Sequence, residues 1–388
     1  MTRAFDDLRI LDLTHVLAGP FCTYQFALLG ADVIKVEPPF QPDCARGRGP
    51  DEAGNAAGLG LTFQMQAANK RALALDLATA AGRDILRRLA GTADVLVENY
   101  TTGSLDALGL GAAELRQANP RLIYCSITGY GETGPRARTG AFDNVIQAAS
   151  GVIAQSGGQK PGLSFVDYAA GYAAAFAISA ALARRARTNL GSAISVSMLE
   201  TALSMMAPEV AALQHGDGAV KRPEAGLLPY QTQDGTLVPG VFTPLQYCRL
   251  ADCLAALGRP LPLLYACKDW PDVWAHSPRL TEELKTILLE RSADDWVAIL
   301  HAADLPAERV VTLAEAIASR QIDARAYFGH SPADGGVQLP LGPARYSEGG
   351  PAIRTAPPRH GAHSGEILAE LGLRPDEIAR LGAEGVIA

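Results

Sequence analysis

Short apolar runs alternate with amphipathic stretches through the N-terminal half of the chain. Runs that predict buried strands cover residues 8–13, 31–39, 69–77, 93–100 and 121–131, with segments of helical periodicity between them. Parallel strands need crossover connections, which helices usually supply, so this alternation predicts βαβ units and a parallel sheet. We therefore expect an α/β fold with an open, mostly parallel, Rossmann-like sheet in a large domain.

The longest apolar stretch surrounds a single acidic residue. Residues 162–185 are rich in Ala and carry one carboxylate, that of Asp167, before the charges of Arg184 and Arg185. This composition predicts a helix that is buried on most sides. A run of about 16 apolar residues is short for a bilayer span, so we interpret the segment as a core helix and expect no membrane association.

Asp167 allows two interpretations at the start of that helix. An aspartate there can accept hydrogen bonds from free backbone N–H groups and favours the positive end of the helix dipole, which is typical of an N-cap. A carboxylate held ionised at a helix N-terminus also remains available as a nucleophile. The two roles are compatible, so Asp167 is the candidate catalytic residue.

A change in composition marks the C-terminal half. Gly, Pro and charged residues cluster at 216–228, as at many domain boundaries, and a hairpin with Asp234 and Gly235 at its turn follows. Amphipathic helices are expected at 244–257, 278–291, 293–303 and 312–319. We predict a large α/β domain over 1–215, a smaller α+β domain over 216–335, and a C-terminal segment, 336–388, that returns to the large domain.

Charge and cysteine content exclude several classes of protein. The formal net charge is −7 with no run of Lys or Arg, which argues against nucleic acid as a partner. The six cysteines are scattered without a Cys-x-x-Cys pair or a Cys/His cluster, so neither a metal site nor a disulfide framework is expected. The N-terminus lacks the pattern of a secretory signal, and we expect a cytoplasmic protein.

Polar residues gather where the predicted strands end. Asn99, Tyr100, Thr128 and Tyr130 follow two neighbouring strands, and the carboxyl ends of parallel strands are where such sheets bind ligands. Each residue alone is as typical of a simple turn. The first strand leads into HVLAGP, which lacks the GxGxxG pattern, so a nicotinamide or flavin cofactor is not expected.

Several ordered segments together resemble a known family. LDLTHVLAGP, LGADVIKVEPP, NKRALALDL, ADVLVENY, the GYGETGP loop and the terminal APPRHGAHSGEILAELGL occur in the order found in class III CoA-transferases, the CaiB-BaiF group that includes formyl-CoA transferase. The resemblance covers nearly the whole chain. It implies that Asp167 attacks an acyl-CoA thioester and carries first a mixed anhydride and then an aspartyl-CoA thioester. Coenzyme A is then a substrate, not a resident cofactor, and a free carboxylic acid is the acceptor.

The resemblance also implies which residues bind the substrates. The residues implied to bind CoA are Leu75, Asp76, Asn99 and Tyr100. Those implied to lie near the acyl group are His15, Leu17 and Ala18, and the loop before Asp143 is implied to belong to the CoA-binding face. Asp143 and Gly240 are further candidates for the substrate site. Each tetrahedral intermediate needs amide donors, which we expect from either the start of the helix at Asp167 or the segment around Gly240. Guanidinium groups pair well with phosphate, and the arginines nearest to these segments are Arg46, Arg71, Arg136 and Arg138.

Departures from the family pattern bear on the substrate. Formyl-CoA transferase has Gln at the position of Leu17 and Arg at the positions of Pro38 and Ala107. A polar group is thereby missing from the expected pocket, which disfavours oxalate or formate and favours a larger short-chain or dicarboxylic acyl-CoA.

Two alternatives to CoA transfer stay open. α-Methylacyl-CoA racemases of the same superfamily use a His-Asp pair, but Phe142 stands here before Asp143, so that base is absent. A non-catalytic CoA-binding protein is the other alternative.

Members of the family form interlocked homodimers, and the resemblance implies the same for this chain.

Overall fold

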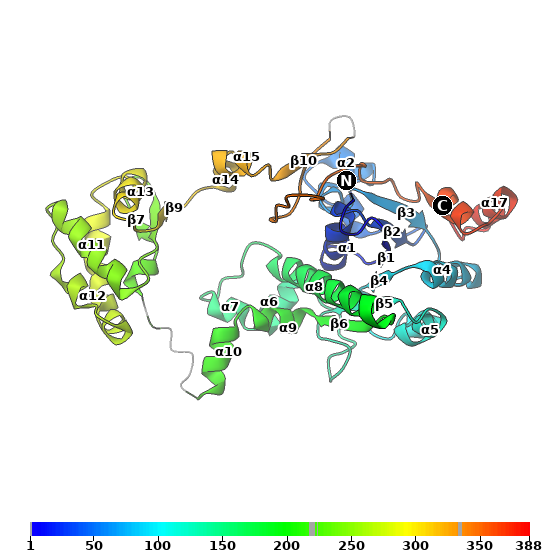
Figure 1. The fold of residues 1–388 in the computed structure, drawn as a ribbon, viewed down its shortest axis with the longest axis horizontal. Coiled ribbons are helices and arrows are strands. Elements are labelled where there is room, and N and C mark those ends of the chain that lie inside the picture. Colours follow the sequence, from blue (N-terminus) through cyan, green and yellow to red (C-terminus); the bar gives the residue numbers. More distant parts are fainter. Residues whose placement is uncertain (1, 217–221, 223, 333–335) are drawn as a thin grey trace. The chain divides into compact units, whose positions relative to one another are not determined.

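The structure is a computed structural model, which describes residues 2–216, 222, 224–332 and 336–388. It divides into two compact units (Figure 1). The larger unit comprises Met1–Val210 and Ala326–Ala388, and the smaller unit comprises Ala211–Arg325. The sequence predicts boundaries at 216 and 336, so in the structure the C-terminal return to the larger unit begins earlier than predicted.

A six-stranded sheet forms the centre of the larger unit. All neighbouring strands pair in parallel, in the order β3-β2-β1-β4-β5-β6. The strands are β1 (Arg9–Leu13), β2 (Asp32–Glu37), β3 (Lys70–Ala74), β4 (Val95–Glu98), β5 (Ile123–Thr128) and β6 (Ala193–Ser197). This is the strand order of doubly wound dinucleotide-binding folds, in which ligands bind where the order reverses, here between β1 and β4. The predicted α/β fold class is confirmed.

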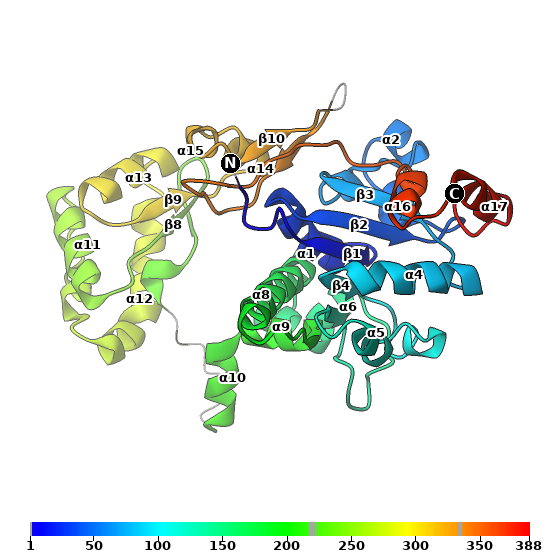
Figure 2. The ribbon, with the colours of Figure 1, turned by 45° about the vertical axis from the view of Figure 1, so that its right-hand side comes forward.

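Helices cover both faces of this sheet because successive strand residues point to opposite sides. In β1, Ile10 belongs to one core and Leu11 to the other. The first core packs beneath α1 (Ala18–Leu28), α8 (Phe165–Thr188) and α9 (Met198–Ser204). The second packs beneath α4 (Ala80–Thr92), α5 (Ala112–Ala118), α16 (Ser364–Glu370) and α17 (Pro375–Ala383), and Figure 2 shows the two helical layers.

Shorter elements complete the larger unit. They are α2 (Glu52–Ala56), α3 (Leu61–Gln64), α6 (Asp143–Ala149), α7 (Val152–Gln155) and the antiparallel pair β10 (Phe328–His330) and β11 (Gln338–Pro340). The boundary between the two units falls within α10 (Ala207–Gln214). Single 3-10 turns lie at η1 (Cys44–Gly47) and η2 (Asp106–Leu108). Near the C-terminus, Ile387 forms a bridge with Leu75 just beyond β3.

The smaller unit has its own core around an antiparallel sheet of three strands. The strands are β7 (Tyr230–Gln231), β8 (Thr236–Pro239) and β9 (Ala307–Arg309). The helices are α11 (Pro244–Ala256), α12 (Trp270–Leu288), α13 (Ala293–Ala302), α14 (Leu313–Ile317) and α15 (Arg320–Ala324), with 3-10 turns η3 (Ala225–Leu227) and η4 (Pro262–Ala266). Trp296 and Tyr247 are buried at its centre.

Three predicted helices differ from those observed. The helix expected at 278–291 begins earlier, because the Asp269 side chain accepts the N–H of Asp272 and caps α12, leaving Pro278 inside the helix. The helix expected at 312–319 ends at Ile317, and Ser319 caps the separate α15. The helix expected between the strand runs 93–100 and 121–131 is divided into η2 and α5, separated by Gly109 with a positive φ of 65°.

The α8 helix is less buried than its composition predicts. By length and composition it is the one described helix that could cross a membrane, yet 33% of its apolar stretch is buried in the structure. Its buried positions, from Val166 through Ala170 and Ala174 to Ile178, recur at helical spacing and form one face on the sheet. The opposite face exposes Tyr172 and Phe176. The expectation of burial on most sides was therefore wrong.

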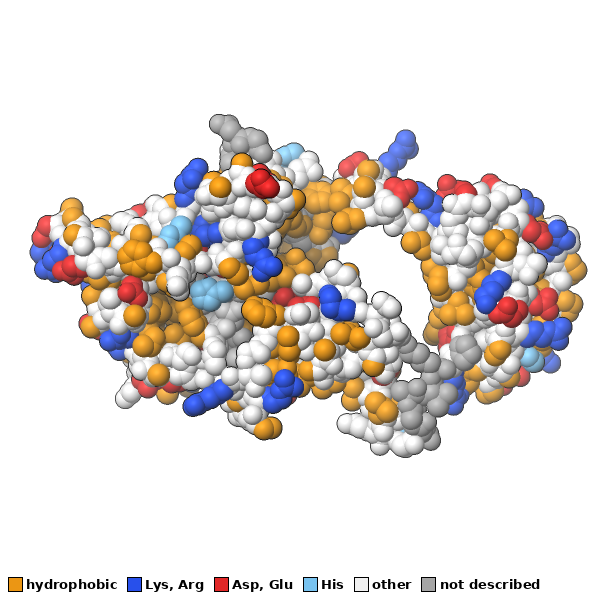
Figure 3. Space-filling model, turned by 180° about the vertical axis from the view of Figure 1, so that it is seen from behind, with side chains coloured by type: hydrophobic (Ala, Val, Ile, Leu, Met, Phe, Trp, Pro, Cys, Tyr) orange, Lys and Arg blue, Asp and Glu red, His pale blue; other side chains and the backbone are white. Residues whose placement is uncertain are grey.

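Charged side chains are scattered over the surface seen in Figure 3. Basic and acidic groups alternate there, and no large area of one sign covers the larger unit on this face. An extended basic surface, which nucleic-acid binding typically requires, is not visible on this side of the molecule.

Candidate active site

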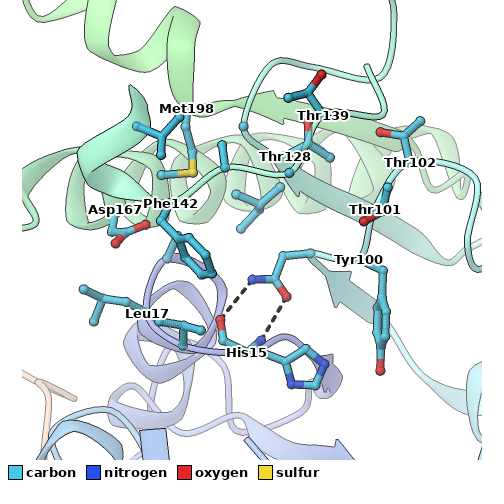
Figure 4. Close-up of a pocket in the computed structure, with 18 of the residues that line it drawn as sticks. His15, Leu17, Tyr100, Thr101, Thr102, Thr128, Thr139, Phe142, Asp167 and Met198 are labelled. Carbon is cyan, nitrogen blue, oxygen red and sulfur yellow. Dashed lines mark hydrogen bonds between the residues drawn. The ribbon is translucent and has the colours of Figure 1, made fainter. Parts of the chain in front are cut away.

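A cavity opens at the carboxyl ends of β1, β4 and β5 in the larger unit. Its volume is about 480 Å³, within the usual range for small-molecule sites. The residues that line it come from the segments directly after these strands, from the loop before α6, and from the starts of α8 and α9 (Figure 4). The cavity therefore lies where the strand order reverses, as expected for this sheet topology.

The turn after β1 is tied to the turn after β4 through one side chain. The backbone N–H of His15 donates to Asn99 Oδ1 at 2.9 Å, and Asn99 Nδ2 donates to the backbone oxygen of His15 at 3.0 Å. The His15 ring also packs edge-on against Tyr100, with ring centroids 5.1 Å apart. Asn99 thus uses both ends of its amide to hold the two strand ends together, as the dashed lines in Figure 4 show.

The next residue, Val16, has a left-handed backbone conformation. Its φ is 70°, which is costly for a β-branched residue. The Val16 N–H donates to both oxygens of Asp43, at 3.1 and 3.2 Å, and its carbonyl accepts a hydrogen bond from Gln66 Nε2. Side chains from two other segments therefore hold this strained turn in place.

A buried ion pair between Lys35 and Asp43 stabilises that turn. Lys35 lies 3.2 Å from Asp43 and donates to the Thr14 backbone oxygen at 2.7 Å, and its side chain is almost fully buried. Burial alone raises the pKa of Asp43, but Lys35 and the backbone N–H groups that Asp43 accepts bring the pKa below its ordinary value. The ionised pair keeps the turn rigid at the edge of the cavity.

The turn delivers the N-terminus of α1 to the cavity. Leu17 is the N-cap, and no side chain caps the helix. The first N–H groups of any α-helix lack partners within the helix, so those of Ala18 and Gly19 remain available. Leu17 and Ala18 both line the cavity, so these donors lie beside it.

The carboxylate of Asp143 caps α8. Asp143 Oδ2 accepts the backbone N–H of Val166 at 2.9 Å and that of Asp167 at 3.3 Å. Its other oxygen accepts a hydrogen bond from Gln147 Nε2, which also donates to the Leu163 carbonyl at 3.0 Å. The N-cap residue itself, Ser164, makes no side-chain cap. The capping role considered for Asp167 is thus performed by Asp143.

The Asp167 side chain is left free to face the cavity. No hydrogen bond or ion pair to its carboxylate is found among the described residues, and its nearest charge is that of Asp143. Burial raises the pKa of Asp167 to about 7, and the negative charge of Asp143 contributes to the increase. Figure 4 places Leu17, Phe142 and Met198 at the same end of the cavity as Asp167.

Comparisons with known proteins identify the family of this chain. A model of CoA-transferase family III matches residues 5–364. The chain belongs to CoA-transferase family III. Succinyl-CoA:glutarate CoA-transferase from Mus musculus is 33% identical over 405 residues, covering 99% of this chain and 90% of that protein. Acetyl-CoA:oxalate CoA-transferase from Acetobacter aceti is 32% identical over 355 residues, covering 88% of this chain and 89% of that protein.

A solved structure extends the similarity to the fold. The crystal structure of a CAIB/BAIF family protein from Brucella suis superimposes with a TM-score of 0.80 at 30% identity, covering 96% of this chain and 100% of that one. The resemblance that the sequence motifs suggested is confirmed. This family III CoA-transferase is an enzyme that acts on CoA thioesters and carboxylates.

The structure brings together seven of the candidate site residues that the sequence singles out. Those that line the cavity are His15, Leu17, Ala18, Asn99, Tyr100, Thr128 and Asp167. Asp143 lies behind this group and acts on it through the α8 backbone. The structure therefore shows that these residues lie together in or beside one cavity, and the role of each residue stays a prediction.

Two of the predicted phosphate-binding arginines lie outside the cavity. Arg46 is buried and pairs with Glu37 at 2.6 Å, and it stacks over the Phe63 ring. Arg71 pairs with Asp32 at 2.6 Å and with Glu370 at 2.7 Å. Their donors are committed to carboxylates within the chain, which argues against a phosphate role.

The other predicted binding residues also lie outside the cavity lining. Leu75 is buried beside the C-terminal segment, and the Asp76 carboxylate accepts the Ala78 N–H at 2.8 Å. Arg138 is exposed on the loop that lines the cavity. Its Nη2 atom lies near Gly103, 3.8 Å from the position that a Cβ atom would take there. Gly240 belongs to the smaller unit, where its N–H donates to the Pro306 carbonyl at 2.7 Å.

Several lining residues were not predicted. Thr101 and Thr102 follow Asn99 and Tyr100 directly, and Met198 follows β6, so the rule that ligands bind at strand ends applies equally to them. Thr139 lies in the irregular loop before α6, where no periodic pattern signals a lining position. Among the described residues, no group of His, Cys, Asp or Glu is arranged to hold a metal ion.

Proposed function

We propose that this enzyme transfers coenzyme A between an acyl-CoA and a free carboxylate through covalent intermediates on Asp167. The observation that carries the proposal is the position of the Asp167 carboxylate, which is free of hydrogen bonds at one end of the cavity while Asp143 caps its helix. A carboxylate so placed can attack a bound thioester without first breaking contacts within the protein.

The reaction then runs in two symmetrical halves. The Asp167 carboxylate attacks the thioester carbonyl, forming a mixed anhydride and releasing CoA thiolate. The thiolate attacks the Asp167 carbonyl, which gives an aspartyl-CoA thioester and frees the first acid with one oxygen from Asp167. The acceptor carboxylate attacks that thioester to form a second anhydride, and the thiolate attacks the acceptor carbonyl. Acyl-CoA leaves, and Asp167 regains a carboxylate that holds one acceptor oxygen.

The N-terminus of α1 is the best source of donors for the oxyanion of each tetrahedral intermediate. The N–H groups of Val166 and Asp167 are taken by Asp143, and that of Gly240 is taken by Pro306. Both sources that the sequence suggested, the start of α8 and the segment around Gly240, are thereby engaged. The first N–H groups of α1 lie beside the cavity, lack a side-chain cap and carry the positive end of the helix dipole.

Coenzyme A is a substrate in this proposal and enters from the opposite end of the cavity. Tyr100, Thr101 and Thr102 lie at that end in Figure 4, where hydroxyl and backbone groups can bind the pantetheine chain. Arg138 on the neighbouring exposed loop is suited to contact a phosphate. The acyl group then lies beside Asp167, and the sequence leaves open a short-chain or a dicarboxylic acid.

Racemisation of an acyl-CoA is the less favoured alternative. It needs a base that exchanges the α-proton, and Phe142 occupies the place where the racemases carry histidine. His15 is the one imidazole among the described residues that line the cavity, and it packs against Tyr100 while Asp167 lies at the other end. In the part of the chain that the structure describes, no histidine is paired with Asp167.

We also propose that the enzyme works as a homodimer, interlocked as the family resemblance implies. The face of α8 opposite the sheet exposes Phe176 at 78% and borders an apolar groove of about 300 Å³ between α1 and the 341–351 segment. A second copy of the chain would cover this apolar surface. Light scattering should give twice the chain mass, and Phe176→Glu should shift the distribution toward the monomer; a wild-type monomer would contradict the proposal.

Chemical trapping tests the covalent step. Incubation with acyl-CoA and hydroxylamine should convert Asp167 to a hydroxamate, which mass spectrometry locates on its peptide, because hydroxylamine attacks anhydrides and thioesters but not free carboxylates. Asp167→Ala should lose both the adduct and turnover while retaining its circular dichroism spectrum. A folded Asp167→Ala variant with normal turnover would rule out the proposed mechanism.

A further inference from the structure

The cavity lining around Asp167 is poor in charged side chains for a site that handles acids. The apolar residues that line the cavity include Leu17, Ile127, Phe142, Val145 and Met198. Among the described residues that line it, none is Lys or Arg, and the ionisable ones are His15, Tyr100 and Asp167.

The cations nearest in the sequence to this lining are Arg136 and Arg138, on either side of Ala137. Arg136 stacks over the Tyr130 ring, and exposed Arg138 is the residue that we assign to a CoA phosphate. The buried cations near the turn after β1 are paired within the chain. Lys35 is buried with Asp43 at 3.2 Å, and Arg46 is buried with Glu37 at 2.6 Å. Burial and the charge of Lys35 lower the pKa of His15, so its ring is neutral at physiological pH. No positive side chain of the described lining is therefore available to a second acidic group on the substrate.

An acyl group with a second, distal carboxylate would bind this cavity unfavourably for two reasons. The first carboxyl carbon must reach Asp167, which directs the rest of a short acyl chain toward Leu17, Phe142 and Met198. Beside these apolar side chains, a distal carboxylate would lose part of its water without gaining a counter-charge from the lining, and the negative charges of Asp143 and Asp167 would repel it. A terminal methyl group in the same place gains apolar contact instead.

On the basis of the proposed function, we infer that the cavity accepts short, uncharged aliphatic acyl groups and discriminates against acyl groups with a second carboxylate. This selects between the two substrate classes that the sequence leaves open. It also separates this enzyme from the relatives named above, whose names specify succinate, glutarate and oxalate.

Donors matched in carbon number test this inference. Butyryl-CoA and succinyl-CoA both carry four-carbon acyl groups and differ in a terminal methyl against a carboxylate, and valeryl-CoA and glutaryl-CoA form the five-carbon pair. With acetate as acceptor, kcat/KM should favour the uncharged donor of each pair by about 100-fold, the size expected for burying an unpaired charge. Equal values, or a preference for succinyl-CoA or glutaryl-CoA, would overturn the inference.

A charge introduced into the cavity should reverse the preference. Phe142 is 66% exposed, so Phe142→Arg should fold, and its guanidinium should improve the succinyl-CoA to butyryl-CoA ratio by about tenfold or more. Leu190→Arg is the matched control, because Leu190 is 50% exposed just beyond the far end of α8. The same change of ratio in both variants, or in neither, would contradict a role for the cavity lining.

Binding to a variant without the nucleophile separates this inference from the proposed function. Calorimetric titration of Asp167→Ala with butyryl-CoA and succinyl-CoA should show the same preference for butyryl-CoA without any turnover. If covalent trapping at Asp167 fails but this preference remains, the proposed mechanism is wrong and the inference about the acyl class holds. If trapping succeeds but succinyl-CoA binds equally well or better, the inference is wrong and the mechanism holds.

Discussion

The carboxylate of Asp143 accepts the backbone N–H of Asp167 at 3.3 Å, and that of Val166 at 2.9 Å. The acid that caps α8 and the acid that faces the cavity are therefore different residues, twenty-four positions apart in the chain. This separation leaves the Asp167 carboxylate without hydrogen bonds. Burial, together with the negative charge of Asp143, raises the pKa of Asp167.

The first prediction concerns the pH dependence of turnover. Asp167 must be ionised to attack, and burial together with Asp143 raises its pKa to about 7. We expect kcat/KM to rise with pH through an apparent pKa of about 7 and to level off above it. Asp143→Asn removes the neighbouring charge but keeps a side-chain acceptor, so its profile should rise at lower pH. An unchanged profile in that variant would show that Asp143 does not act on Asp167 electrostatically.

The second prediction concerns the stability of the α8 cap. Asp143→Ala removes the acceptor of two backbone N–H groups and leaves Gln147 Nε2 with the Leu163 carbonyl as its remaining acceptor, so it should lower the free energy of unfolding of the larger unit by about 1–2 kcal/mol. Asp143→Asn should cost less because its amide oxygen can still accept. Denaturant unfolding followed by circular dichroism measures both. Equal losses would mean that the charge of Asp143, and not its hydrogen bonds, stabilises the helix.

The third prediction tests the strained turn at Val16. Glycine adopts its φ of 70° without steric cost, so Val16→Gly should leave the free energy of unfolding unchanged or raise it by up to about 1 kcal/mol. Val145→Gly is the matched control, because Val145 lies in α6 with ordinary helical geometry, and there the same substitution should destabilise by about 0.5 kcal/mol. A loss at position 16 as large as at position 145 would argue against strain.

The fourth prediction links the Asp167 pKa to stability. Its pKa is about 7 in the folded protein and near 3.8 in the unfolded chain, so the folded state holds the proton more tightly, and the stability it contributes falls as pH rises between these values. Asp167→Asn avoids that loss. The variant should be more stable than the wild type by on the order of 2 kcal/mol above about pH 8, with allowance for partial exposure, and by little near pH 4. A constant difference across this range would contradict the shift.

The large features of the fold could be predicted from the sequence because each has a local signal. Apolar runs of strand length, separated by helical periodicity, gave the parallel sheet with helices on both sides, and the strand-end rule placed Asn99 and Tyr100 at the cavity. The same rule would have found Thr101, Thr102 and Met198. The short helices of the smaller unit were harder to predict. A single N-capping residue such as Ser319 begins a new helix within a segment whose composition looks continuous.

Side-chain partnerships could not be predicted from local pattern. Arg46 and Arg71 lie in segments from which an arginine could reach a phosphate. In the folded chain, however, Arg46 pairs with Glu37 and Arg71 pairs with Asp32, and no local sequence pattern signals these pairs. The exposed face of α8 was missed because an Ala-rich helix has the same composition whether the fold covers one face or all of it. The division of roles between Asp143 and Asp167 depends on tertiary contact and has no sequence signature.

Isotope transfer to Asp167 tests the central proposal most directly. The purified enzyme is supplied with acyl-CoA and an acceptor whose carboxylate carries oxygen-18, and the peptide containing Asp167 is weighed by mass spectrometry after many turnovers. We expect Asp167 to acquire the heavy isotope, since one acceptor oxygen remains on its carboxylate in each cycle, and Asp143 to stay unlabelled. Continued turnover without label on Asp167 would contradict the covalent mechanism.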